Sequence, residues 1–270
     1  MKAFKTIIDL ILDIWHDRRL LMNLTIQDFK RRFAGSYLGM LWGFINPLLT
    51  MVVYWLVFQF GFRSGDANGI PFMAWFACGI CVWLFFSEAF SSASSAFVSY
   101  SYLVKKVVFN INILPLVKIF SSLVVHLFFV LLVAIICSLF GFFPSLYLLQ
   151  LPYYMFCAIA LVFAISLVFA SVMVFFRDLG QIISIVLMIG MWGTPIAWNL
   201  AQFSSHPVLQ TILKLNPIFY LVDGYRDCFV QQTWFWEKGL SLYFWGILLV
   251  LLLWGGSVYN RLKNSFADFL

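Results

Sequence analysis

Charged residues are scarce in this chain and are missing altogether from long stretches of it. Asp, Glu, Lys and Arg make up 10% of the residues, and none occurs in 119–176. That stretch is long enough for two helices across the roughly 30 Å hydrocarbon core of a membrane. Four more charge-free stretches each allow one span: 33–62, 67–87, 179–213 and 239–260. A water-soluble domain is excluded, and six transmembrane helices are predicted.

Alternation of polar and apolar residues, which is typical of outer-membrane β-strands, is missing too. The run 127–136 is apolar at every position, whereas a barrel strand is polar at every second one. The chain is therefore predicted to be an all-α integral membrane protein. The first span is expected to begin near Tyr37 and the others to lie near 71–96, 113–140, 152–176, 181–198 and 239–260.

The first 36 residues are predicted to form a cytoplasmic segment ahead of a six-helix domain at 37–270. Apolar residues recur at three- and four-residue spacings in 4–15, which indicates an amphipathic helix lying in the membrane interface. A basic cluster, Lys30-Arg31-Arg32, follows and is expected to attract anionic lipid. The short apolar core of a cleavable signal peptide is lacking.

Basic residues fall unevenly on the two sides of the predicted spans. With the amino terminus inside, thirteen of the 17 Lys and Arg residues lie on that side, and basic residues near span ends favour the cytoplasm. Both termini are therefore expected to be cytoplasmic. This topology explains the net charge of +6 without a nucleic-acid partner.

Motifs of catalysis and metal binding are absent from the sequence. There is no phosphate-binding loop G-x-x-x-x-G-K-[ST] and no zinc-type H-E-x-x-H. Cys78 and Cys81 lie three residues apart in an apolar span without a nearby His, so packing is the simpler interpretation. We expect no catalytic residue, metal or cofactor in this chain.

Three polar features interrupt the predicted spans. Asn46-Pro47 lies within the first span, where proline kinks a helix, either for structure or for gating. Glu88 is the one acid inside a span; it either hydrogen-bonds to neighbouring serines or shapes a transport route. Residues 199–238 are expected to form two short external or re-entrant helices, with polar residues at Asn216, Pro217, Asp223, Arg226 and Asp227.

Seven short motifs follow one another along nearly the whole chain: 37–42 (YLGMLW), Asn46-Pro47, 103–107 (LVKKV), 176–179 (FRDL), 194–196 (TPI), 215–217 (LNP) and 224–227 (GYRD). In their order they resemble the membrane subunit of ABC exporters of lipid-linked polysaccharide and polyol-phosphate chains. Three stretches, 46–65, 144–154 and 209–229, are most similar to teichoic acid translocation permeases of Gram-positive bacteria. One departure is Asn110, where proline is frequent in the family.

The resemblance implies a homodimer in the cytoplasmic membrane of a bacterium, together with two copies of a separate ATPase that binds ATP and magnesium. The amino-terminal helix and the loop 99–112 would rest on that ATPase, and the helices of 199–238 would cap the outer exit. The expected coupling residues are Tyr102, Lys105, Lys106, Arg177 and Asp178. The expected substrate entrance comprises Lys30, Arg31, Arg32, Tyr37 and Trp42.

The resemblance implies export of lipid-linked wall teichoic acid, with membrane lipids as further partners. Export of another lipid-linked polysaccharide, such as O-antigen or capsule, is the alternative. A secondary transporter remains open, although no internal repeat is evident. An intramembrane lipid-modifying enzyme would need a His, Asp or Cys cluster at one depth, which the sequence does not provide.

Overall fold

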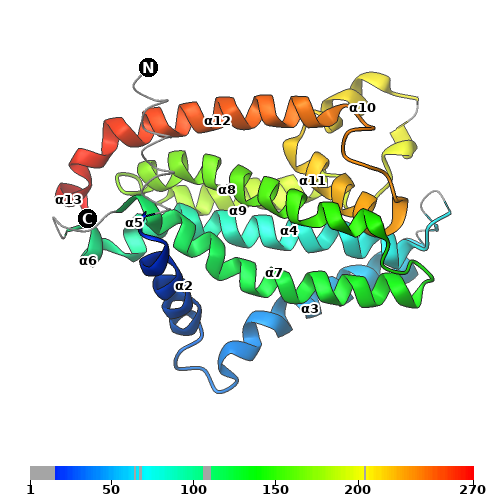
Figure 1. Ribbon diagram of the computed structural model, residues 1–270, viewed down its shortest axis with the longest axis horizontal. Helices are drawn as coiled ribbons and strands as arrows, with labels where there is room; N and C mark the ends of the chain where they lie inside the picture. Colours follow the sequence, from blue (N-terminus) through cyan, green and yellow to red (C-terminus); the bar gives the residue numbers. More distant parts are fainter. Residues whose placement is uncertain (1–15, 64, 67–68, 106–110, 204) are drawn as a thin grey trace.

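A computed structural model describes residues 16–63, 65–66, 69–105, 111–203 and 205–270, which fold as a bundle of helices (Figure 1). Five helical segments in this described part are long and apolar enough to cross a membrane. The first is Gly39–Gly61, made of η1 (Gly39–Leu41), α3 (Trp42–Leu56) and η2 (Val57–Gly61), and the second is α4 (Phe72–Ser94). The third is Ile111–Leu139, made of η3 (Ile111–Ile113) and α7 (Leu114–Leu139), and the fourth is Leu146–Met173, made of η4 (Leu146–Gln150) and α8 (Leu151–Met173). The fifth is Leu240–Phe269, made of α12 (Leu240–Leu262), η7 (Lys263–Ser265) and α13 (Phe266–Phe269).

Proline sets where many of these helices begin. Its fixed φ and missing N–H suit the first turn of a helix, whose N–H groups have no partner within the helix. Proline stands immediately before the helix or in its first turn at Pro71 for α4, Pro115 for α7, Pro152 for α8, Pro207 for α10 (Pro207–Lys214) and Pro217 for α11 (Pro217–Arg226). The predicted and observed starts therefore agree closely for α4, α7 and α8.

Helix α4 forms the centre of the bundle. It packs against α7, α8 and α11. In its most apolar stretch 78% of the residues are buried, compared with 11% in that of Gly39–Gly61. Small residues allow some of the closest helix contacts. A Cβ on Gly255 of α12 would lie only 2.8 Å from the Ala164 carbonyl oxygen of α8, so α12 rests on α8 where glycine permits it.

The fifth predicted span is shorter than expected. The prediction placed it at 181–198, but α9 spans Leu179–Gly193, 15 residues, or about 22 Å at 1.5 Å per residue. The chain then turns at Thr194-Pro195. The all-helical prediction is confirmed for the described residues, whereas the count of six full-length spans is not.

The two ends of the bundle carry different short helices (Figure 1). One end, hereafter the α13 end, holds α5 (Ala96–Ser99), α6 (Ser101–Val104) and α13; the other, hereafter the α11 end, holds η5 (Leu200–Phe203), α10, α11 and η6 (Asp227–Gln231). The short helices expected within 199–238 are thus present. The predicted amphipathic helix at 4–15 lies outside the described residues.

Helix α2 (Arg18–Arg32) is an element that we did not predict. It packs against α7 and leads through the turn at 33–38 to η1 and α3. Figure 1 shows α2 and α3 diverging from the bundle on the α7 side. The basic cluster therefore forms the last turn of a helix beside the first span.

Candidate functional site

A cavity of about 260 Å³ lies between α2, α3, α4 and α7. Its lining brings together residues of the predicted entrance and of the predicted polar spans, which are far apart in sequence: Arg32, Trp42, Asn46, Pro47 and Glu88. Pro47 is inside α3, and Thr50 donates a hydrogen bond to the Asn46 carbonyl oxygen at 2.9 Å. The remaining polar lining comes from Thr50, Cys81, Ser122 and His126.

An ion pair stands at the rim of this cavity. The Arg32 guanidinium, at the end of α2, contacts Glu88 Oε1 of α4. Ser92, one turn further along α4, also donates a hydrogen bond to Glu88 Oε1 at 2.9 Å. The serine contact matches one of the two interpretations of Glu88, and the arginine contact was not foreseen. Both charged side chains remain about a third exposed, so the pair is accessible.

One hydroxyl group in the cavity wall is buried without a partner. Ser122 of α7 is 2% exposed, and its Oγ has no hydrogen-bond partner among the described residues. Leaving a buried hydroxyl group unsatisfied costs about 1–3 kcal/mol. The neighbouring Ser121 is equally buried and equally unpaired, but it does not line the cavity.

Deeper in the bundle, His126 connects three helices. Its Nε2 lies 2.6 Å from the Tyr225 hydroxyl group of α11, and its Nδ1 lies 3.8 Å from Cys81 Sγ of α4. The ring also packs on Phe85, with 4.6 Å between centroids. Because His126 has partners for both ring nitrogens, it contributes a fixed polar contact to the cavity wall.

The other predicted entrance residues do not line the cavity. Lys30, Arg31 and Tyr37 are exposed around the end of α2 and the following turn, and Tyr37 is fully exposed. Arg31 lines a second, more open hollow together with Asp28, Tyr100 and Lys118. The structure thus divides the predicted entrance into Arg32 and Trp42 at the cavity and the rest outside it.

Helix α2 is tied to the α13 end by a buried carboxylate. Asp28 Oδ1 accepts hydrogen bonds from the Tyr100 hydroxyl group at 2.7 Å and from Lys118 Nζ at 2.6 Å. Burial and the bond to Asp28 raise the pKa of the Tyr100 phenol well above its usual range. These contacts attach α2 to α7 and to the turn before α6, so a force on this turn reaches α2.

The predicted coupling residues lie at the same end and are exposed. Tyr102 lies in α6 and Lys105 directly follows that helix. Arg177-Asp178 lies in the turn between α8 and α9. Lys106 and Asn110 lie outside the described residues. The structure groups the described four on the α13 end without making them partners of one another in any contact that it shows.

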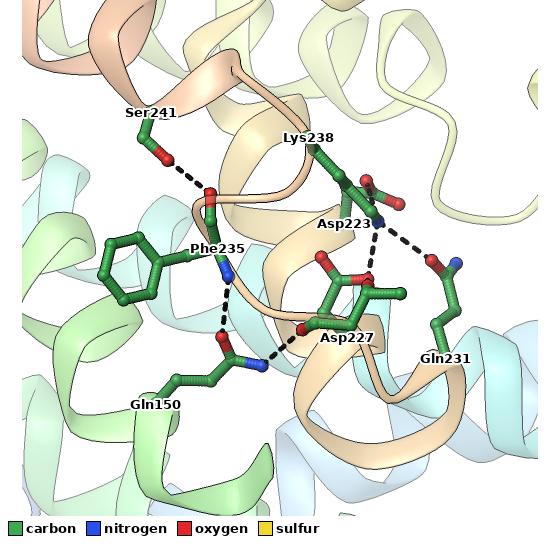
Figure 2. Close-up of polar contacts among 8 residues, drawn as sticks. Gln150, Asp223, Asp227, Gln231, Phe235, Lys238 and Ser241 are labelled. Carbon is green, nitrogen blue, oxygen red and sulfur yellow. Dashed lines mark hydrogen bonds and ion pairs between the residues drawn. The ribbon is translucent and has the colours of Figure 1, made fainter.

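At the α11 end, a chain segment following η6 is bound down by side chains on several elements (Figure 2). We call residues 232–239 the strap. Gln150 of η4 makes two hydrogen bonds to the strap: its Nε2 donates to the Thr233 carbonyl oxygen at 2.7 Å, and its Oε1 accepts from the Phe235 N–H at 3.1 Å. Ser241 donates to the Phe235 carbonyl oxygen at 2.7 Å. Both hydrogen-bonding groups of the Gln150 amide are therefore used on the strap.

Lys238 fixes the other end of the strap. Its ammonium donates to Asp223 Oδ2 at 2.7 Å, to Asp227 Oδ1 at 2.5 Å and to Gln231 Oε1 at 3.0 Å, as Figure 2 shows. Burial, with a smaller contribution from Asp223, raises the pKa of Asp227 to about 6. Asp223 and Asp227, two of the predicted polar residues, thus bind the strap through Lys238, which was not among the predicted site residues.

Arg226 performs a different task. Its side chain is buried, and the central carbon of its guanidinium, Cζ, lies 3.5 Å from the centroid of the Trp75 ring. The guanidinium also donates hydrogen bonds to the carbonyl oxygens of Pro195 and Ile196 at 2.8 and 3.1 Å. Asn216 caps α11 by accepting from the Ile218 N–H, and its amide donates to Thr194 Oγ1 at 2.9 Å. These residues join α11 to the turn that ends α9.

Some of the functional geometry gave a sequence signal and some did not. Lys118 is the only charged residue of α7 and Asp28 the only acid of α2, so each was a candidate for a charged partner. Ser122 and Gln150 gave no such signal. In the described residues, no group of three or more His, Cys, Asp or Glu side chains could hold a metal ion.

Comparison with known proteins agrees with this architecture. The profile of the ABC-2 type transporter family matches residues 19–230. The chain is 28% identical over 252 residues to an O-antigen export system permease protein, RfbA, of Klebsiella pneumoniae, covering 93% of this chain and 95% of that protein. It is also 28% identical over 262 residues to the RfbA permease of Myxococcus xanthus, covering 97% and 99%. The chain therefore belongs to the ABC-2 type transporter family of membrane permeases.

Proposed function

We propose that this chain is the transmembrane subunit of an ATP-driven exporter that moves a lipid-linked polysaccharide of the O-antigen kind across the bacterial cytoplasmic membrane. The observation that carries the proposal is the alignment with two O-antigen export permeases over nearly their whole length. The polar cavity with its accessible ion pair supports it, because a polysaccharide head must leave water at one end of the bundle.

The relatives favour the polysaccharide alternative over teichoic acid, the substrate that the motif resemblance placed first. Both of them are named for O-antigen export, and neither is named for a polyol phosphate. Family membership also argues against a secondary transporter, because an ABC-2 permease works with an ABC ATPase. ATP and magnesium then belong to that partner.

The expected assembly is a homodimer of the permease with two ATPase subunits. Apolar side chains of α9 are exposed in the single chain, among them Ile185 and Ile189, and a second copy would cover part of this face. The exposed residues Tyr102, Lys105, Arg177 and Asp178 at the α13 end are the proposed ATPase contacts, and α10 and α11 the proposed outer gate.

The basic asymmetry supports an orientation with the α13 end in the cytoplasm. This end carries the basic cluster on α2 and Lys118, Arg177 and Lys263, whereas the α11 end carries Lys214, Arg226 and Lys238. Under the positive-inside rule, both termini are cytoplasmic and the strap faces outward.

Reconstitution tests this function. The permease, purified together with its partner ABC ATPase, is placed in vesicles that contain a short lipid-linked polysaccharide, and glycan on the far leaflet is measured by a membrane-impermeant lectin. We expect transfer that requires ATP and is lost when a Walker A lysine of the ATPase is replaced. Transfer of a polyol-phosphate polymer but not of the polysaccharide would restore the teichoic acid interpretation, and ATP-independent transfer would refute both.

A further inference from the structure

We propose that the cavity between α2, α3, α4 and α7 binds the phosphate-bearing head of the lipid-linked glycan, and that this phosphate displaces Glu88 from Arg32. The inference rests on the proposed function and names the part of the substrate that this site takes. It differs from a general basic entrance, because only one of the three clustered basic residues lines the cavity.

The size and lining of the cavity fit a phosphate with one sugar ring attached. Its volume of about 260 Å³ is slightly below the roughly 300–1,000 Å³ of pockets for drug-sized ligands, so it suits a smaller group. Trp42, Asn46 and Thr50 are among the residues that line it. Ring faces pack against the C–H face of a sugar, while the amide and hydroxyl groups can bond its oxygens. The lining therefore suits the first sugar of a glycan.

Among the described residues, Arg32 is the one Lys or Arg side chain that lines the cavity. Its guanidinium carries five N–H donors and can bind a phosphate through two of them at once. A phosphate placed beside Arg32 therefore competes directly with Glu88 for the same guanidinium.

Glu88 has another contact when Arg32 turns to a phosphate. Ser92 donates to Glu88 Oε1 at 2.9 Å, so the carboxylate stays hydrogen-bonded and can accept from sugar hydroxyl groups. Glu88 neutralises Arg32 near the membrane, where an unpaired charge is costly. An anionic head would replace the carboxylate as the partner of Arg32.

A lipid anchor is favoured over a free sugar phosphate because of what borders the cavity. Trp42 lines the cavity at the start of α3 and is partly exposed, and Leu49 and Val53 are exposed apolar residues further along the same helix. An acyl or prenyl chain attached to the phosphate can lie along this face. A bulk phospholipid shares the same chemistry, so the experiment must separate the two sources.

Binding measurements on the permease–ATPase complex in nanodiscs test the site. The probe is a fluorescent polyprenyl diphosphate that carries one N-acetylglucosamine, and the competitor is phosphatidylglycerol. Arg32→Gln should weaken probe binding about tenfold, because the guanidinium that would bind the phosphate is lost. Arg31→Gln is the matched control and should change binding less than twofold, since it removes the same charge from the neighbouring residue, which does not line the cavity. Glu88→Gln should tighten binding about threefold or more, by freeing Arg32.

Three outcomes would overturn the site. They are unchanged binding in Arg32→Gln, equal weakening by Arg31→Gln at unchanged melting temperature, and competition by phosphatidylglycerol as effective as that by unlabelled probe. The proposed function fails separately. If the wild-type complex binds the probe with the expected variant pattern but moves no polysaccharide, the site stands and the function falls. If polysaccharide moves but the variants bind alike, the function stands and the site falls.

Discussion

Replacing Arg226 with Met should destabilise the α11 end strongly, because two backbone carbonyl groups depend on this side chain. The guanidinium donates to the Pro195 and Ile196 carbonyl oxygens and stacks on Trp75. Hydrogen bonds to a charged group contribute about 1.5–3 kcal/mol each, and a desolvated cation–π contact about 2 kcal/mol. Desolvation of the charge offsets several kcal/mol of that. We expect a net loss of about 2–5 kcal/mol, because the two carbonyl groups are left without a donor at about 1–3 kcal/mol each.

The Arg226→Lys variant separates charge from geometry. An ammonium keeps the positive charge but lacks the plane that stacks on the Trp75 indole ring and the Nε–H that donates to the Trp75 carbonyl oxygen. We therefore expect an intermediate loss of about 1–3 kcal/mol. Arg177→Met serves as the control for loss of a positive charge, because Arg177 is exposed at the opposite end.

Unfolding in mixed micelles provides the measurement. Stability is followed by the reactivity of the native cysteines toward a thiol reagent as denaturing detergent increases; all five are buried, and Cys78 lies beside Gly79, where a Cβ would be 3.0 Å from Arg226 Nη2. Arg177→Met should behave as wild type. A change of less than 1 kcal/mol in Arg226→Met would refute the argument that this side chain satisfies the turn after α9.

Three further predictions concern the outer network and the topology. Burial raises the Asp227 pKa from 3.8 to about 6, so the folded state disfavours the ionised carboxylate. The free energy of unfolding of the wild type, measured relative to Asp227→Asn, should therefore fall by up to about 3 kcal/mol as pH rises from 4 to 6. The same pH dependence of melting in both proteins would contradict this. Gln150→Ala removes both hydrogen bonds to the strap, and amide exchange at Phe235 should accelerate at least tenfold by mass spectrometry, whereas an unchanged rate would show that Gln150 does not hold the strap. In a cysteine-free background, an impermeant thiol reagent added to intact cells should label Ser205→Cys but not Ser265→Cys, and labelling at 265 would refute cytoplasmic termini.

The sequence predicted the long helices well because charge and proline mark their limits. Span boundaries for α4, α7 and α8 follow from charged residues on one side and Pro71, Pro115 or Pro152 on the other. The fifth predicted span was placed too far along, because 179–213 contains no charged residue to end it. Pro195 was the available signal, since the residue before a proline disfavours helix.

The candidate site was predicted as separate pieces and not as one arrangement. Arg32, Asn46 and Glu88 were each noticeable as polar groups near apolar spans, but hydrophobic pattern does not tell which helices become neighbours. Their meeting depends on α2 docking beside α7 and α4, which the Asp28 contacts with Tyr100 and Lys118 secure. Ser122 carried no signal at all, because a serine in an apolar helix ordinarily bonds to its own backbone.

The shortness of α9 has a consequence for the surrounding lipid. At about 22 Å, its 15 residues fall several ångströms short of an average hydrocarbon core of about 30 Å, while α4 beside it has 23 residues. Arg226 supplies hydrogen bonds to the turn where α9 stops, so that turn can lie below the normal membrane surface. The lipid along α9 must then shorten to match it, a hydrophobic mismatch that a bilayer relieves by local thinning. A thinned leaflet beside the permease shortens the distance over which a hydrophilic chain has to be carried, and bilayers of longer acyl chains should slow the protein.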